Sequence, residues 1–220
     1  MKSRIGLIAT LLKKRYDPNQ ILVRLAFRKA LEGCDSVLDV GCGVSSTLRD
    51  LGMPNTTGFE GYQPDYEEAR RRNTHDQLIK GDARSLANFF QPKQFDACIA
   101  IDVIEHLTKE DGIKFMQDME RIARKRVVLF TPKGFLPQRH SANDDLQAHL
   151  SGWEPKEMNG FGYHVTGQLG PKVLRGEGHV LKRNPKAFWG VVSFLGQLTS
   201  IPRHPEKAAA ILCVKSQTNS

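Results

Sequence analysis

The sequence predicts an α/β fold with a doubly wound, mostly parallel sheet. Short apolar runs alternate with segments of helical periodicity through the middle of the chain, a pattern typical of parallel strands with helices on both faces. The run FDACIAI at 95–101 is apolar almost throughout, as expected of a central strand. The chain has 220 residues, 40% of them hydrophobic, which suffices for one domain with a large core.

The first helix is expected to begin at Asp17. An N-cap acid, a proline at the first helical position and a glutamine three residues after the cap stand at 17–20. An apolar stripe at helical spacing follows, made of Ile21, Leu22, Leu25, Ala26 and Leu31. This helix is expected to pack on the domain that follows.

The other elements are expected in regular alternation after it. Predicted strands are 37–40, 57–60, 78–82, 95–101 and 126–130, and predicted helices are 47–51, 65–72 and 110–124. Parallel sheets of this kind bind ligands beyond the carboxyl ends of their strands. The residues expected at that edge are Gly41, Gly43, Glu60, Asp82, 102–106 and 131–132.

The glycine turn and Glu60 indicate a nucleoside ligand. Glycine lets the backbone approach a ligand closely, and Glu60 lies 19 residues after Gly41, a distance at which a carboxylate reaches ribose hydroxyls. Ser46 replaces the third glycine of the dinucleotide pattern, which disfavours NAD.

Five segments match, in order and spacing, the successive motifs of one enzyme family. They are VLDVGCGVSS, GFEGY, KGDAR, FDACIAIDVIEHL and RVVLFTPKGF, spanning roughly residues 36–135. The series resembles the class I S-adenosylmethionine-dependent methyltransferases, and together the segments are far more specific than any one of them. The resemblance implies a Rossmann-like, seven-stranded sheet in three α/β/α layers, with further strands near 163–166 and 209–214 and an antiparallel last strand inserted between its neighbours.

The resemblance also implies contacts for the cofactor S-adenosylmethionine. Asp39, Gly41 and Gly43 would form the loop beneath its methionine part, and Glu60 would hold the ribose hydroxyls. Ser45 stands where the family often has another glycine.

The same resemblance places the adenine and the rest of the cofactor further along the chain. Asp82 would bind the adenine amino group with Ala83 beside it, and Asp102 and Val103 would line the cofactor. The alternative role for Asp82 is that of a helix N-cap.

Glu105 and His106 are the expected catalytic residues if the acceptor is a hydroxyl, because histidine is a suitable general base near neutral pH. The alternative is that both are structural. No resident metal is expected. The less favoured alternative is that Asp102, Glu105 and His106 hold a divalent ion, because they resemble the acid-x-x-Glu-His cluster of methyltransferases acting on quinone precursors and RNA 3′ ends.

Acceptor contacts are expected from the long segment 132–153, which has few apolar groups. Its candidate substrate residues are His140, His149 and Trp153. For His149, packing at a helix entry is an equal alternative.

The whole chain is expected to be a single domain in four parts. These are an N-terminal helical cap at 1–34, a cofactor-binding core at 35–135, a substrate loop at 136–160 and a helical elaboration at 170–206. The net charge is +8, and its distribution is +6 over 1–34, −3 over 35–150 and +5 over 151–220. The acidic centre suits a cationic cofactor, so the basic flanks are expected to contact the acceptor or a membrane surface.

The expected function is methyl transfer to oxygen or carbon of a small-molecule, lipid or glycan-intermediate acceptor. The alternatives are an RNA-directed or metal-assisted O-methyltransferase and a non-catalytic cofactor-binding protein. Nucleic acid is disfavoured as a partner, because neither an RNA-binding module nor the amine-methylating Asn/Asp-Pro-Pro-Tyr motif occurs.

The apolar segment 187–202 has basic flanks. It indicates either a lid or dimer contact, which is favoured, or a peripheral membrane contact. The protein is expected to be a monomer or a homodimer. Four cysteines without a Cys-x-x-Cys pair and no convincing signal peptide or spanning segment indicate a cytoplasmic protein, with peripheral membrane attachment as the alternative.

Overall fold

The computed structural model describes residues 18–45, 47–137, 148–176 and 180–217. The expected N-cap Asp17 and the substrate candidate His140 lie outside these residues. The helix after Asp17 is present, and it begins with Pro18 at its first position.

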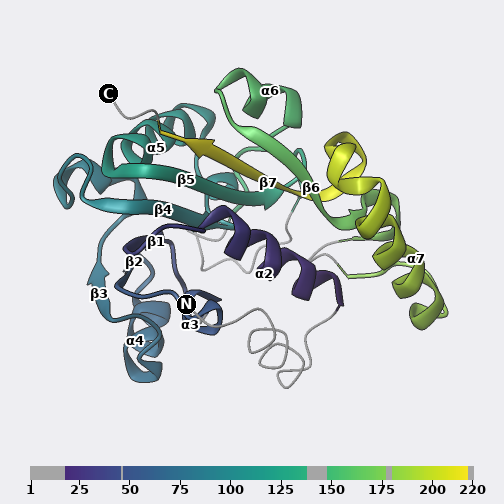
Figure 1. The fold of residues 1–220 in the computed structure, drawn as a ribbon, viewed down its shortest axis with the longest axis horizontal. Coiled ribbons are helices and arrows are strands. Elements are labelled where there is room, and N and C mark those ends of the chain that lie inside the picture. Colours follow the sequence, from purple (N-terminus) through teal and green to yellow (C-terminus); the bar gives the residue numbers. More distant parts are fainter. Residues whose placement is uncertain (1–17, 46, 138–147, 177–179, 218–220) are drawn as a thin grey trace.

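The described residues form a seven-stranded sheet at the centre of the molecule (Figure 1). Its spatial order is β3-β2-β1-β4-β5-β7-β6. The strands are β1 (Val37–Val40), β2 (Thr56–Glu60), β3 (Gln77–Lys80), β4 (Phe95–Ile101), β5 (Ala123–Pro132), β6 (His164–Pro171) and β7 (Ala208–Ser216). The first five strands pair in parallel, and β7 lies antiparallel between β5 and β6. The predicted doubly wound sheet with an inserted antiparallel last strand is thereby confirmed.

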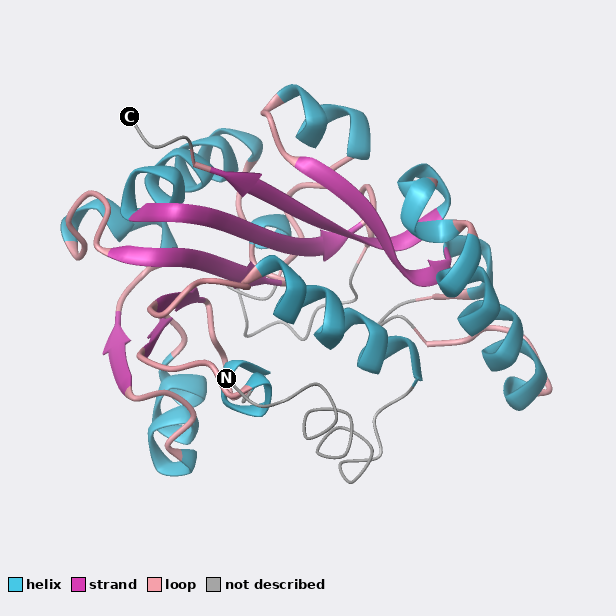
Figure 2. Cartoon of the chain, viewed as in Figure 1, coloured by secondary structure: helices cyan, strands magenta, loops and turns pink. Residues whose placement is uncertain are grey.

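Helices cover both faces of this sheet (Figure 2). They are α2 (Pro18–Ala30), α3 (Thr47–Leu51), α4 (Gln63–Arg72), α5 (Lys109–Ile122), α6 (Pro155–Gly160) and α7 (Lys186–Thr199). The short 3-10 helices include η1 (Ala83–Asn88), η2 (Ile104–His106), η4 (Lys172–Leu174) and η6 (Ile201–Arg203). One core cluster joins the sheet to α5 and α6, and a second joins it to α2 and α3.

The alternation of side chains along β4 explains why this strand is apolar throughout. Cys98 and Ala100 belong to the cluster under α5, whereas Ala97 and Ile99 belong to the cluster under α2. Since successive side chains of a strand point to opposite faces, a strand covered on both sides buries every residue. The predicted central strand is therefore confirmed with its bounds.

The boundary between α5 and β5 differs from the sequence expectation. The helix was expected to reach Arg124 and the strand to start at Arg126, but α5 ends at Ile122 and β5 begins at the next residue. Arg124 and Lys125 both pair with the buried Asp96 of β4, at 2.8 and 2.9 Å. These ion pairs and the ladder with β4 hold the two residues in the extended chain.

Two other expectations concern the C-terminal third. β6 runs on to Pro171 instead of ending at residue 166, and α7 ends at Thr199 and is followed by η6.

All four cysteines are buried and unpaired, as expected of packing residues. Within the described residues no helix has the length and apolarity needed to cross a membrane.

Candidate active site

The turn after β1 has a backbone conformation that glycine adopts readily. Gly41 and Gly43 have φ values of +63° and +51°, in the left-handed region that side chains disfavour. A Cβ on Gly41 would lie 2.5 Å from a methyl carbon of Val103. The absence of a side chain at Gly41 thus lets the loop after β4 pack directly on the turn after β1.

Glu60 joins the carboxyl ends of β1 and β2. Its side chain is buried, with one carboxylate oxygen accepting from the Gly43 N–H at 2.8 Å and the other from the Tyr62 N–H at 2.7 Å. Each carboxylate oxygen has more than one acceptor site, so these two bonds orient Glu60 and leave capacity for ligand hydroxyls. The expected ribose-binding role fits this geometry and stays a prediction.

Asp39 lies inside the sheet and is 2% exposed. Its carboxylate lies 3.1 Å from Nε2 of the buried His75, whose Nδ1 lies 2.9 Å from the Thr74 hydroxyl. Asp39 therefore supports the glycine turn from within the fold. No motif in the sequence marks His75 as its partner. The His75 ring reaches Asp39 across Gly58 of the intervening strand β2, where a Cβ would lie 2.8 Å from His75 Nδ1.

Asp82 caps η1, which is the alternative role considered for it. Its carboxylate accepts from the Arg84 N–H at 2.8 Å and from the Arg84 side chain at 3.0 Å. These bonds lower the pKa of Asp82, with the side-chain bond as the main cause. Ala83 is half-buried beside it. The adenine contact remains a prediction for an Asp82 that is already held in place.

Asp102 follows β4 with a φ of +54°, a conformation uncommon for any residue but glycine. Its N–H donates to the Phe130 carbonyl at 2.9 Å. The residue retains exposed surface, yet the protein packed around its carboxyl raises its pKa to about 7 by desolvation. A cationic ligand beside this carboxyl would lower its pKa again, because a nearby positive charge stabilises the ionised form.

Glu105 is buried below η2 and is 2% exposed. One oxygen accepts from the Thr131 hydroxyl at 2.9 Å, while the other, Oε1, has no hydrogen-bond partner among the described residues. Burial raises the pKa of Glu105 well above its usual value, and the charge of Asp102 raises it further. Glu105 therefore favours its protonated form, in which the carboxyl group is not available to accept a proton from an acceptor.

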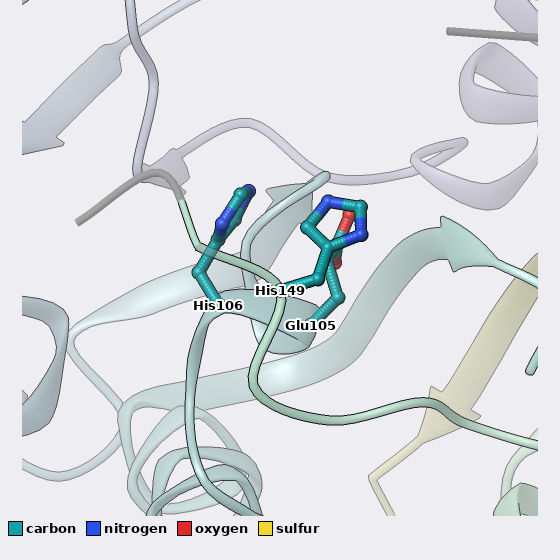
Figure 3. Close-up of side chains that lie close together, drawn as sticks. All are labelled: Glu105, His106 and His149. Carbon is teal, nitrogen blue, oxygen red and sulfur yellow. The ribbon is translucent and has the colours of Figure 1, made fainter. Parts of the chain in front are cut away.

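The side chains of His106, His149 and Glu105 lie close together (Figure 3), with the centroids of the two imidazole rings 4.8 Å apart. Nδ1 of His106 lies 3.1 Å from the Ala148 carbonyl, and Nδ1 of His149 lies 2.6 Å from the Leu136 carbonyl. Since a carbonyl only accepts, both Nδ1 atoms carry the hydrogen, and in the neutral form of each ring Nε2 carries the lone pair. Each ring is thus oriented with a basic nitrogen opposite its backbone contact.

The three residues also form a group with metal-ligating atoms. One ligand atom each from Glu105, His106 and His149 lies within 4.8 Å of the others. The sequence expectation combined Asp102 with Glu105 and His106, and it missed His149, which lies 43 residues after His106. Only the return of the chain over η2, where the Leu150 N–H donates to the Glu105 carbonyl at 2.8 Å, brings His149 to this place.

Trp153 does not face a substrate. It is fully buried, its indole N–H donates to the Ile104 carbonyl at 3.3 Å, and the Lys109 ammonium lies 3.6 Å from its ring centroid. The expectation of a substrate contact is corrected here, because the ring fills the core between η2 and α5.

A cavity of about 240 Å³ lies between α4 and β3 and includes His75 and Asp76 in its wall. It lies at the amino end of β3, whereas Glu60 ends β2 at the opposite edge of the sheet. The residues that carry chemistry therefore gather away from this cavity.

Comparison with known proteins finds similarity in the segment that contains the glycine turn after β1, and in the fold as a whole. A family model described as a methyltransferase domain matches residues 38–131. No curated protein matches the sequence significantly.

Several solved structures share the fold. A S-adenosylmethionine-dependent methyltransferase from Archaeoglobus fulgidus is 13% identical over 96% of this chain and 99% of its own, with a TM-score of 0.56. The YcgJ protein of Bacillus subtilis is 14% identical over 89% of this chain and 98% of its own, with a TM-score of 0.53. Magnesium protoporphyrin IX methyltransferase from Synechocystis is 14% identical over 91% of this chain and 78% of its own, with a TM-score of 0.51. That structure was solved with bound S-adenosylmethionine. The segment that matches the methyltransferase-domain model holds the glycine turn, Glu60 and the loop after β4, and the fold of the chain is that of solved S-adenosylmethionine-dependent methyltransferases.

Proposed function

We propose that this protein binds S-adenosylmethionine and transfers its methyl group to an oxygen or carbon atom of a small-molecule, lipid or glycan-intermediate acceptor. The residues at the carboxyl edge suit this cofactor. The Gly43 turn leaves room for a ligand, because a Cβ there would meet only an Asp65 carboxylate oxygen at 3.7 Å. The oriented Glu60 carboxylate can accept from ribose hydroxyls, and Asp102 favours a cation nearby. When bound, the cofactor supplies an electrophilic methyl group with its own leaving group.

The oriented ring of His106 is the observation that carries the choice of acceptor atom. His106 lies three residues after Val103, which packs on the glycine turn, and its N–H donates to the Val103 carbonyl at 3.0 Å. With the hydrogen on Nδ1, Nε2 can take a proton from an acceptor hydroxyl or an acidic C–H as the methyl group is transferred. Glu105, buried beneath, acts as a positioning residue.

The loop after β5 favours an acceptor that carries a negative group. Lys133 and Lys172 line a small pocket together with Leu136 and Arg175. Burial lowers the pKa of Lys172, and the charge of Lys133 lowers it further. A bound anion would offset both effects, because it stabilises the ammonium forms.

The proposal is tested by measuring the release of S-adenosylhomocysteine with a panel of acceptors. The panel contains phenols, sugar alcohols and carbon acids, each with and without a phosphate or carboxylate, together with RNA oligonucleotides. We expect turnover with a hydroxyl or carbon acceptor and a preference for its anionic form. Turnover with RNA alone, or cofactor binding without turnover of any acceptor in the panel, would contradict the proposal.

A metal-assisted O-methyl transfer is the second candidate, and the unpaired Oε1 of Glu105 favours it. Two imidazoles whose Nδ1 atoms are held by carbonyls, next to one carboxylate, are a common ligand set for divalent ions. A metal there would hold and acidify an acceptor hydroxyl.

We expect the protein to bind Co²⁺ with a visible absorption band, and the His149→Ala variant to bind it roughly ten-fold or more weakly, because one of three protein ligands is lost. His204→Ala removes an exposed histidine elsewhere and serves as the matched control. Equal Co²⁺ affinity in both variants, or full activity after chelation, would exclude the metal-assisted reaction.

A further inference from the structure

The helix α7 exposes its apolar side chains and buries polar ones. Its buried residues are Ser193 and Gln197. Its large exposed hydrophobic residues are Phe188, Val191, Leu195 and Leu198, with between 53% and 58% of their surface accessible. A helix on the surface of a globular protein normally has the opposite arrangement.

Hydrogen bonds on the polar side fix this orientation. The Gln197 side chain donates to the Gly167 carbonyl at 3.0 Å and accepts from the Gly170 N–H at 2.8 Å. Ser193 Oγ lies 3.2 Å from an Arg175 nitrogen that donates to it. Turning the helix to bury its apolar side would leave these buried polar groups unpaired, which is costly.

The exposed apolar residues form one continuous stripe. They are spaced by three, four and three positions, so they lie along one face of the helix. At ~1.5 Å per residue the stripe is about 15 Å long. Trp189 is half-buried beside it, with its ring 5.2 Å from that of Phe188. We call Phe188, Val191, Leu195 and Leu198 the α7 stripe.

Basic side chains flank the α7 stripe at both ends. Lys182, Arg183 and Lys186 precede or begin the helix, and the helix itself contains no acidic residue. Arg203 and Lys207 follow it, with Glu206 between them. The Arg183 guanidinium lies 4.9 Å from the centroid of the Trp189 ring of α7. Lys182 and Lys186 gain no stabilisation from the helix dipole, which disfavours cations at a helix N-terminus. These cations are exposed and stand next to the stripe in the chain, an arrangement that suits an anionic partner.

We infer that the α7 stripe docks on an anionic lipid surface, with the helix lying in the plane of the membrane interface. Apolar residues on one face and cations around it are the features that bind such helices to acidic bilayers. A second copy of the chain fits less well, because a twofold pairing of α7 in either direction brings basic ends together.

The position of α7 gives this contact a consequence for the site. The helix packs on β6 and lies on the side to which β4 and β5 point (Figure 1). Docking through the α7 stripe would therefore turn the carboxyl edge of the sheet toward the bilayer. The inference goes beyond the proposed methyl transfer, since lipid binding requires neither cofactor nor acceptor.

The test is sedimentation of the full chain with vesicles. We expect binding to vesicles of equal parts phosphatidylcholine and phosphatidylserine, weak binding to phosphatidylcholine alone, and release by high salt. The variant Val191→Glu/Leu195→Glu, with both changes at exposed positions, should bind roughly ten-fold or more weakly, and Lys186→Gln should bind with intermediate strength. Gln117→Glu adds a negative charge on the exposed face of α5 and should bind like the original chain.

Calorimetry with S-adenosylhomocysteine checks that each variant keeps its cofactor site, so that lipid binding and cofactor binding are judged separately. Equal binding to both kinds of vesicle, or undiminished binding by Val191→Glu/Leu195→Glu, would overturn the inference. A dimer in solution that the same double variant dissociates, without vesicle binding by the original chain, would show that a second copy covers the stripe instead.

Discussion

Replacing Glu60 by alanine is expected to weaken the binding of S-adenosylhomocysteine by roughly a hundred-fold or more. The change removes the acceptor proposed for the ribose hydroxyls and also both bonds that tie the ends of β1 and β2 to one carboxylate. Each hydrogen bond to a charged group contributes ~1.5–3 kcal/mol, so the loss of two such contacts gives an effect of this size. Isothermal titration calorimetry measures it.

Two variants control for general effects of the Glu60 change. Glu60→Gln keeps the shape and one acceptor oxygen and should bind with intermediate affinity. Glu67→Gln removes an exposed carboxylate of α4 and should leave affinity unchanged. If Glu60→Ala, still folded by circular dichroism, binds the ligand as the original chain does, then the cofactor lies elsewhere.

Replacing His106 by alanine is expected to lower turnover by roughly a hundred-fold or more while cofactor affinity stays nearly constant. A positioned general base contributes ~10²–10⁴ in rate, and the side chain of His106 is not among the groups assigned to the cofactor. Activity should rise with pH as the base loses its proton in the original enzyme, and that rise should vanish in the variant. Steady-state kinetics across pH, with an acceptor from the panel, provide the measurement.

Added imidazole distinguishes a base from a structural residue. It should partly restore turnover in His106→Ala if the ring acts by taking a proton, whereas a loss of packing would not be rescued in this way. Glu105→Gln, which keeps the buried shape, should also lower turnover, through the position of the loop. Equal turnover in His106→Ala and in the original chain would end the assignment.

Much of the fold was predictable because its signals are local. The mostly apolar runs at 37–40 and 95–101 became β1 and β4 with the expected bounds, since burial on both faces favours apolar side chains and admits a polar one such as Asp39 only with a partner. The start of β5 was missed because Arg124 and Lys125 look like the polar end of a helix. Their partner Asp96 lies on the neighbouring strand, and the sequence pattern does not show that pairing.

The candidate site divides in the same way. Gly41, Gly43 and Glu60 stand at fixed distances in one strand–turn–helix–strand unit, so their spacing alone placed them together. Trp153 was misjudged because an aromatic residue in a polar segment resembles a binding residue, while its burial depends on packing against η2 and α5.

By itself the sequence determined the class of fold and the edge of the sheet where the chemistry lies, because the alternation of strands with helices and the glycine turn are local patterns. Only the tertiary structure decided which distant side chains meet, as His149 with Glu105 and His75 with Asp39. It also decided which face of α7 points outward. Those outcomes depend on hydrogen bonds between residues far apart in the chain, such as Gln197 with Gly167, whose partners are chosen by the packed fold.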